Sequence, residues 1–442
     1  MTTLGLALVS GLSSSASAQE SHDHGSHAGP ASADAAPDHT ADHPRLQTLA
    51  REEAHRLGSG TAWRPAAAPM FGWMGGEHLH WMAHANLVGG YDLQGSERGD
   101  GQPVSMNWVM GEVLADVFHG NVAARAMLSA EPWTVPGAGY PLLGQSGETW
   151  EGEPLHDRQH PHDLFMELAL HGRQLLHSGV GFELYVAPAG EPALGPVAFP
   201  HRTYGYFDPV APISHHWQDA THISFGVLTL GVFTEQVKIE GSWFNGREPD
   251  EDRLNLDLAA PDSYAGRISF APIDELVLQA SYGYLSEPEA LHPGEPLRRA
   301  TASLQWDRLS AGGSGFSGAL VVGRNISHGL YTDTALAEGV WSLGKAIHPY
   351  ARVELAEKSA EDLVLEGANE ETYLIPSLTL GYLGTWEPVH GWSLGLGVRG
   401  NVLLVGGQLE PFYGTELPAG VLVYGQLRPA PMLHRSHSTH SP

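Results

Sequence analysis

Apolar and polar residues alternate one by one over long stretches of this chain. Between Leu79 and Leu93 the odd positions are mostly apolar, whereas the even positions up to Asn86 carry histidine, methionine and asparagine. Successive side chains of a β-strand point to opposite faces, so this pattern predicts a strand with one apolar and one polar face. The same alternation returns in residues 235–244, 297–307 and 391–404.

About sixteen runs of this kind follow one another along the chain. Many of them approach the ~9–11 residues with which a tilted strand crosses a bilayer. Their rough extents are 77–93, 105–118, 120–131, 163–177, 180–188, 222–233, 235–244, 263–272, 275–285, 297–307, 315–324, 336–344, 347–358, 373–385, 391–404 and 419–428.

Short and long connections alternate between these runs. Short ones lie at residues 119–120, 178–179 and 272–274, and long ones include 94–104, 132–162 and 189–221. This rhythm is typical of bacterial outer-membrane barrels. The sequence therefore predicts an all-β protein of the outer membrane, an antiparallel transmembrane β-barrel of about 16 strands, within a range of about 14–16. The alternatives are a soluble barrel-like fold and a propeller, although no internal repeat of fixed period supports the propeller.

The composition divides the chain into four parts. Residues 1–18 are predicted to be a signal peptide, because a short apolar stretch precedes Ala16-Ser17-Ala18. Residues 19–69 are rich in Ala, Pro, Asp, Ser and His and predict a disordered, His-rich periplasmic tail. Residues 70–430 form the predicted barrel, and residues 431–442 a second His-rich tail. An even number of strands would place both tails in the periplasm.

Charge and residue content exclude several classes of function. The chain has 50 acidic and 23 basic residues and a formal charge of −27, which argues against nucleic acid as a partner. It contains no cysteine, so disulfides, thiolate metal sites and cysteine nucleophiles are excluded. The common hydrolase, metalloprotease and nucleotide-binding motifs do not occur, so we predict no catalytic residue and do not expect an enzyme.

Histidine is unusually frequent, with 26 residues in the chain. Neutral imidazole is the commonest metal ligand, and thioether sulfur favours soft Cu(I), so the distribution predicts binding of a transition-metal ion, copper before zinc. In the N-terminal tail we expect metal capture by His22, His24, His27, His39 and His43. On the inward wall of the barrel we expect metal contacts from His78, His80, Met82, His84, Met106 and Met110. The alternative is that these residues simply line a wet lumen.

Two connecting segments carry further candidate ligands. Pro161 keeps its backbone extended, so His160 and His162 are expected to point the same way, with Asp163 beside them. A carboxylate can orient an imidazole by accepting its second N–H. The segment with His215, His216 and His222 is expected to converge with the first at the mouth of the pore. The alternative is a tight turn in which Asp and His side chains cap backbone groups.

The remaining inward charges are expected to line the pore. They are Glu112, Asp116, Arg125, Glu131, Glu167, His171, Arg173 and Arg399.

Several motifs resemble those of an uncharacterised bacterial outer-membrane β-barrel family. They include Asp157-Arg-Gln-His-Pro-His-Asp163, Met127-Leu-Ser-Ala-Glu-Pro132, His215-His216 and Gly246-Arg-Glu-Pro-Asp250. In composition and architecture the chain is also loosely similar to the copper resistance protein B family. That resemblance implies an outer-membrane barrel that handles copper.

Three hypotheses of function follow from the sequence. The first is a barrel that binds or passes transition-metal ions in metal resistance or homeostasis, with outer-membrane lipid, the ions and a periplasmic metal-handling protein as partners. The second is a porin-like channel for an organic or anionic solute that uses inward arginines such as Arg125 and Arg399. The third is a barrel hydrolase built on residues 157–163.

Overall fold

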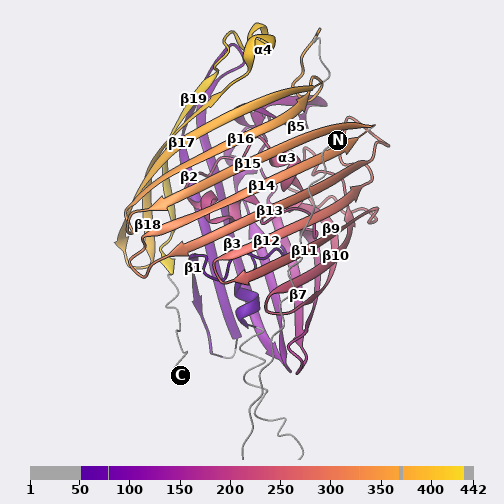
Figure 1. Cartoon of the computed structure of the whole chain (residues 1–442), viewed down its shortest axis with the longest axis vertical. Helices are drawn as coiled ribbons and strands as arrows, with labels where there is room; N and C mark the ends of the chain where they lie inside the picture. The colour runs from indigo at the N-terminus through magenta and orange to yellow at the C-terminus, as the bar shows by residue number, and fades with distance from the viewer. Residues whose placement is uncertain (1–50, 78, 328, 368–371, 433–442) are drawn as a thin grey trace, which may run out of the picture. The chain divides into compact units, whose positions relative to one another are not determined.

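Sixteen strands in the described part of the chain close into one antiparallel barrel (Figure 1). The structure is a computed structural model that describes residues 51–77, 79–327, 329–367 and 372–432. These residues belong to a unit that spans Ala41–Pro442, and the unit Met1–Thr40 lies outside them. The barrel closes where β19 pairs with β2, with Val423 opposite Tyr91. The barrel strands are β2 (Leu79–Gly95), β3 (Gly101–Val117), β4 (Gly120–Leu128), β7 (Phe165–Leu175), β8 (Gly181–Gly190), β9 (Ser224–Phe233), β10 (Val237–Asn245), β11 (Ser263–Ile273), β12 (Leu276–Leu285), β13 (Leu297–Leu309), β14 (Gly315–Ser327), β15 (Leu330–Ser342), β16 (Ile347–Ser359), β17 (Thr372–Val389), β18 (Trp392–Leu403) and β19 (Ala419–Pro429).

The predicted fold is confirmed, and each predicted run corresponds to one of these strands. The largest displacement is in β15, which begins at Leu330 and not near residue 336. The first residues of β15 alternate Tyr331, which faces outward, with Thr332 and Thr334, which face the lumen. The first charged inward residue of β15 is Glu338. The connection to β14 therefore shrinks to residues 328–329.

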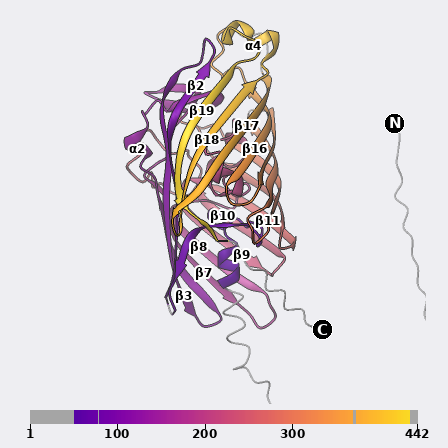
Figure 2. The same cartoon turned by 90° about the vertical axis from the view of Figure 1, so that its left-hand side faces the viewer.

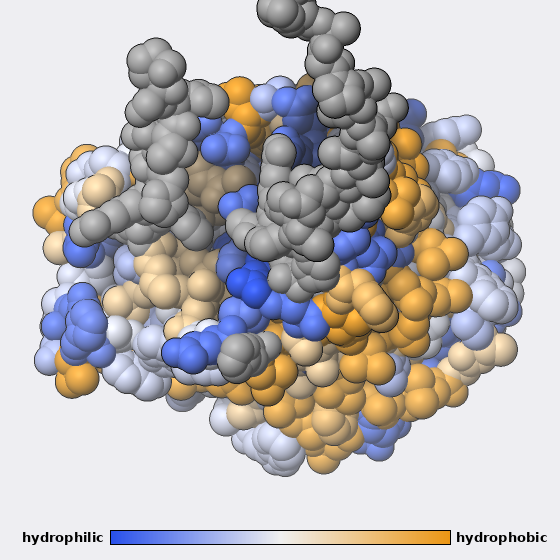
Figure 3. All heavy atoms as spheres, turned by 90° about the horizontal axis from the view of Figure 1, so that it is seen from below, coloured by the Kyte–Doolittle hydropathy of each residue, from blue (hydrophilic) through white to orange (hydrophobic). Residues whose placement is uncertain are grey.

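The outward face of the barrel is apolar. In β10, Ile239 and Trp243 are more than half exposed, whereas Lys238 and Glu240 on either side of Ile239 are buried. In β2, Leu79 and Leu93 are exposed and Asn86 is buried. Figure 3, seen from below, shows hydrophobic residues gathered over a large part of the outer surface. Alternation in each strand thus produces an apolar outer surface and a polar lumen. No described helix is long and apolar enough to cross a membrane.

The two ends of the barrel differ. Short turns such as residues 234–236 and 274–275 lie at one end, which we call the turn end. Long connections lie at the other, the loop end, where α4 is seen in Figures 1 and 2. These connections hold the helices and the hairpin of β5 and β6. The elements are α2 (Glu131–Thr134), β5 (Tyr140–Trp150), β6 (Glu153–Gln159), η1 (Phe199–His201), η2 (Thr203–Tyr206), α3 (His215–Gln218), η3 (Ala220–His222) and α4 (Gly406–Tyr413).

Two connections fold into the lumen and fill much of it. Nearly every residue from 191 to 223 is buried, and so are Leu142 and Leu143 of β5. Trp217 of α3 donates a hydrogen bond to Thr332 on the barrel wall, with 2.7 Å between Nε1 and Oγ1. The main apolar cluster accordingly joins inward residues of the wall to these connections rather than lying between two sheets.

The prediction of a disordered tail over residues 19–69 is wrong for residues 51–69. This segment lies inside the barrel, where Arg125 donates to the carbonyl of Gly60 and Lys238 to that of Thr61. Trp63 is 2% exposed and packs on Leu57 and wall residues of the turn end. Polar composition suggested disorder, but the inward charges of the wall offer this backbone its hydrogen-bond partners. We call residues 51–69 the plug segment.

The boundaries of the barrel part also need correction. Residues 70–75 form β1 (Met70–Gly75), an extra strand that pairs with β2 and is not a wall strand. Met70 and Phe71 also pair with β20 (Pro431–Met432), so the first residues of the predicted C-terminal tail are part of the fold. The tail histidines His22, His24, His27, His39 and His43 lie outside the described residues.

Candidate functional site: a polar path through the lumen

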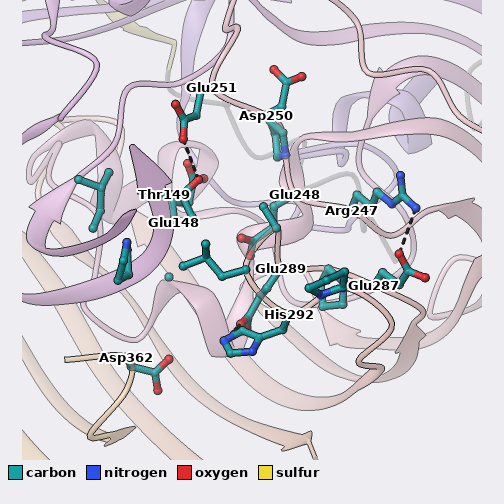
Figure 4. A pocket seen from close by; sticks show the side chains of 18 of the residues that line it. Glu148, Thr149, Arg247, Glu248, Asp250, Glu251, Glu287, Glu289, His292 and Asp362 are labelled. Atoms are coloured by element: carbon teal, nitrogen blue, oxygen red, sulfur yellow. Dashed lines mark hydrogen bonds and ion pairs between the residues drawn. The ribbon is translucent and has the colours of Figure 1, made fainter. Parts of the chain in front are cut away.

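An acidic cavity of about 700 Å³ opens at the loop end of the barrel. Its walls come from β5, β6 and three connections, residues 247–252, 287–293 and 361–362 (Figure 4). Of the described residues that line it, nine carry carboxylates and one, Arg247, a permanent positive charge. The carboxylates are Glu148, Glu248, Asp250, Glu251, Asp252, Glu287, Glu289, Glu361 and Asp362. The excess of negative charge attracts cations and repels anions.

The carboxylates of the acidic cavity are held by different partners. Glu251 accepts hydrogen bonds from the backbone N–H groups of Glu151 and Gly152, at 2.8 and 3.1 Å. Glu287 is paired with Arg247 at 3.1 Å. Burial, and then the charge of Glu148, raise the pKa of Glu248 to about 8. Glu248 is therefore largely protonated at neutral pH and gains charge when a cation approaches.

Five histidine rings lie together on the lumen side of this cavity. Neighbouring ring centroids are 5.1–6.3 Å apart. We call this group the imidazole cluster, and its members are His160, His162, His215, His216 and His222. All five are buried. The predicted convergence of the two His-bearing connections is confirmed by these contacts.

Carboxylates of the acidic cavity touch the imidazole cluster directly. Glu148 Oε1 is 2.8 Å from His160 Nε2, and Glu248 Oε1 is 3.3 Å from His216 Nδ1. Glu148 is also paired with the buried Arg253. Burial, and then the proximity of His160, lower the pKa of His216 to about 3, so this imidazole is neutral at physiological pH. His216 is therefore a polar but uncharged member of the imidazole cluster.

Backbone and carboxylate groups orient the remaining rings. Glu131 Oε2 accepts from the backbone N–H of His162 and lies 2.9 Å from its Nδ1. Asp219 Oδ1 lies 2.6 Å from His215 Nδ1. Asp163 lies beside the cluster, 3.6 Å from Arg253, and burial raises its pKa to about 7.

Below the cluster the path continues towards the turn end. His222 also lines a cavity of about 10 Å³, the small inner cavity, together with Ser59, Gly60, Met127, Met166, Glu167, Glu191 and His201. Glu167 is 3.5 Å from Arg125, which donates to Glu112 at 2.9 Å. Glu112 then lines a third cavity, of about 310 Å³, next to Met82 and His80. Titratable groups thus connect cavities at the two ends of the barrel.

The residues predicted to form a metal-binding wall on β2 and β3 have other contacts in the structure. His84 Nδ1 is 3.0 Å from the carbonyl of Phe71, and His80 lies 3.7 Å from Asp116. Met106 and Met110 belong to the main apolar cluster, because β1 and the lumen connections cover this stretch of wall. His78 lies outside the described residues. Met82 lines the turn-end cavity with His80.

Within the described ranges, no three His, Asp or Glu side chains converge so as to hold a metal ion. In the same ranges the polar partners of His160 and His162 are Glu148, Glu131 and the carbonyl of Pro161.

The charges predicted to line the pore are buried in the lumen, but they are paired. Arg173 donates to Asn121 and contacts His171, whose Nε2 is 3.0 Å from Glu183. Arg399 lies 3.2 Å from Asp208 of a lumen connection. Asp116 pairs with Arg51 of the plug segment. Glu131 lies beyond the end of its strand and begins α2. Arg125 and Arg399 therefore do not present free anion-binding groups, because each is paired with a carboxylate.

Sequence reasoning missed several residues of the path. Glu148, Glu248 and Arg253 lie in connections, and the acidic segment around Arg253 is typical of a solvated loop tip. Met166 and Glu191 sit at strand ends, where no periodicity marks their direction. The signal that was available is the concentration of acidic residues in 248–252.

Comparisons with known proteins yield structural likeness only. No family model matches the chain, and no curated protein matches its sequence. An anion-selective porin from Comamonas acidovorans is 11% identical, with 80% of this chain and 100% of that chain covered and a TM-score of 0.48. OmpF of Salmonella typhi, in complex with daunomycin, is 10% identical over 78% of this chain and 97% of that one, with a TM-score of 0.47. The outer membrane channel DcaP of Acinetobacter baumannii is 7% identical over 81% and 100%, with a TM-score of 0.48.

Proposed function

We propose that this chain is a porin-like channel of the bacterial outer membrane that favours small cations. The observation that carries the proposal is the polar path, which links the acidic cavity at the loop end to the cavity beside Glu112 at the turn end. An apolar outer face suits contact with lipid. Because the barrel is closed, the backbone N–H and C=O groups of every strand are hydrogen-bonded to a neighbouring strand inside a bilayer.

Charge distribution favours cations over anions along this path. Nine carboxylates surround the entrance, whereas Arg125, Arg352 and Arg399 deeper in the lumen are each paired with a carboxylate. An entering anion would have to displace one of these carboxylates. An anionic solute was part of the second hypothesis from the sequence, and its binding at these three arginines is therefore disfavoured.

The filled lumen implies a small conductance. The plug segment and the connection 191–223 occupy the lumen, and the small inner cavity holds about 10 Å³. That volume suits one water molecule or one ion. We therefore expect passage of single small ions and not of sugars or peptides.

The proposal is tested by conductance in planar lipid bilayers. The full-length protein should give cation-selective currents, read from the reversal potential across a KCl gradient. Replacing two exposed carboxylates of the cavity, Asp250→Asn with Glu361→Gln, should reduce the preference for K⁺ over Cl⁻. Glu410→Gln is the matched control, because this exposed carboxylate of α4 does not line the cavity. Absence of current or selectivity for anions would refute the proposal.

A further inference from the structure

The small inner cavity has an unusual set of lining side chains. It brings two thioethers, Met127 and Met166, together with two imidazoles, His201 and His222. All four side chains are at least nine-tenths buried. Its volume of about 10 Å³ leaves room for one ion or one water molecule.

His222 presents a bare ring nitrogen at this cavity. Its Nδ1 lies 2.9 Å from the carbonyl oxygen of Asp219, which has no proton to give, so Nδ1 donates and carries the hydrogen. The neutral ring then has a lone pair on Nε2, and this buried atom has no hydrogen-bond partner in the described residues. A ring fixed by a carbonyl at one nitrogen and open at the other is the arrangement in which histidine binds metals.

His201 and Met127 form the opposite side. The distance between His201 Nε2 and Met127 Sδ is 3.2 Å. Two atoms that share one ion at about 2.0 and 2.3 Å are separated by roughly 3.2–3.5 Å at ordinary ligand angles. The pair therefore needs little movement to hold a common ion.

The charges around the small inner cavity favour a monovalent cation over a divalent one. Glu167 and Glu191 line the cavity, with Arg125 and Arg267 each 3.5 Å from one of them. Each carboxylate is thus partly balanced by its arginine, which leaves less negative charge than a divalent ion requires. Thioether and imidazole ligands select soft cations, whereas Mg²⁺ and Ca²⁺ require oxygen ligands.

We propose that the small inner cavity binds one soft monovalent metal ion, of the Cu(I) or Ag(I) type, through Met127, Met166, His201 and His222. The site lies on the polar path, so the proposal deepens the proposed function by naming an ion that the channel retains. Binding in detergent solution does not depend on conduction, however, so the two proposals fail separately.

The test is titration of the full-length protein in detergent with Ag(I), together with X-ray absorption of the Cu(I)-loaded protein. Other histidines of the chain also bind these ions, so the readout is the sulfur contribution to the metal's coordination shell. Wild type should show sulfur ligands, and Met127→Leu with Met166→Leu should remove them. Loss of a group that only hydrogen-bonds to a metal ligand lowers metal affinity roughly 10- to 100-fold. Loss of the two sulfur ligands should lower the affinity of this site by more than that.

The matched control is Met74→Leu with Met82→Leu, because these two methionines line the turn-end cavity near His80. Leucine has nearly the volume of methionine, so both double variants should fold, as heat-dependent gel mobility will show. The control should keep the sulfur signal. Loss of the signal in the control with retention in Met127→Leu/Met166→Leu would overturn the proposal, as would a wild-type protein without sulfur ligands.

Discussion

Buried histidine is the residue type that most distinguishes this lumen. His216 is enclosed by His160, His215 and the carboxylate of Glu248. Burial favours its neutral form, so the folded protein takes up a proton at this ring only near pH 3. In the unfolded chain a histidine takes up its proton near pH 6.5.

This difference predicts acid sensitivity with a definite sign. Because the folded-state pKa is lowered, the stabilising contribution is present above about pH 6.5 and is lost as the pH falls towards 3. His216→Gln cannot take up the proton. Between pH 6.5 and 4, the slope of its free energy of unfolding against pH should therefore be smaller than that of wild type by the contribution of about one proton. The measurement is unfolding in detergent followed by gel mobility as a function of pH. His390→Gln, at a fully exposed turn, should leave the slope unchanged, and an unchanged slope in His216→Gln would contradict the prediction.

Among the elements, the plug segment changes the interpretation of the chain most. Its indole at Trp63 packs on Leu175 and Phe233 of the wall and stacks under Arg56, whose guanidinium carbon is 4.0 Å from the ring centroid. The ring also donates to Glu53. Such contacts make the segment part of the folded core.

Trp63→Ala should therefore destabilise the barrel by about 3–5 kcal/mol, the cost of removing a buried aromatic side chain. Trp133→Ala is the control, because this indole of α2 is 63% exposed and should cost much less. Heat-dependent gel mobility and tryptophan fluorescence in detergent follow both variants. Equal midpoints for Trp63→Ala and wild type would mean that the plug segment does not contribute to stability.

On the scale of the whole molecule, charge is separated between an acidic entrance and a lumen of paired ions. The nine carboxylates of the acidic cavity act together on an approaching ion. In the proposed channel, the effect of these carboxylates on ion selectivity is electrostatic and acts over a distance.

Cation preference should accordingly weaken with salt. The Debye length falls from about 10 Å at 0.1 M to about 3 Å at 1 M ionic strength, so the entrance charges are screened across the cavity at high salt. Reversal potentials measured at the same KCl ratio around 0.1 M and around 1 M should give a lower K⁺ to Cl⁻ permeability ratio in the second case. A ratio independent of salt would place selectivity in the constriction and not in the acidic cavity.

The wall of the barrel was predictable from the sequence because its signal is local. Ile239 and Trp243 alternate with Lys238 and Glu240 within one strand, and a period of two determines the strand and the direction of each side chain together. The rhythm of short and long connections then determined the antiparallel barrel. The start of β15 was predicted too late, because its first inward residues, Thr332 and Thr334, are uncharged.

Only the tertiary structure decided what fills the lumen. An inward polar residue has the same sequence pattern whether it meets water, an ion or another segment, so Met106 and His84 could not be separated from metal ligands by alternation. Connections carry no periodicity. The carboxylate partners are Glu148, 12 residues before His160, and Glu248, 32 residues after His216, and no strand or helix period relates these positions. The sequence by itself thus determined the barrel and the two faces of its wall, because each strand encodes them locally. The plug segment, the imidazole cluster and the small inner cavity depend on long-range contacts that exist only once the barrel has closed around them.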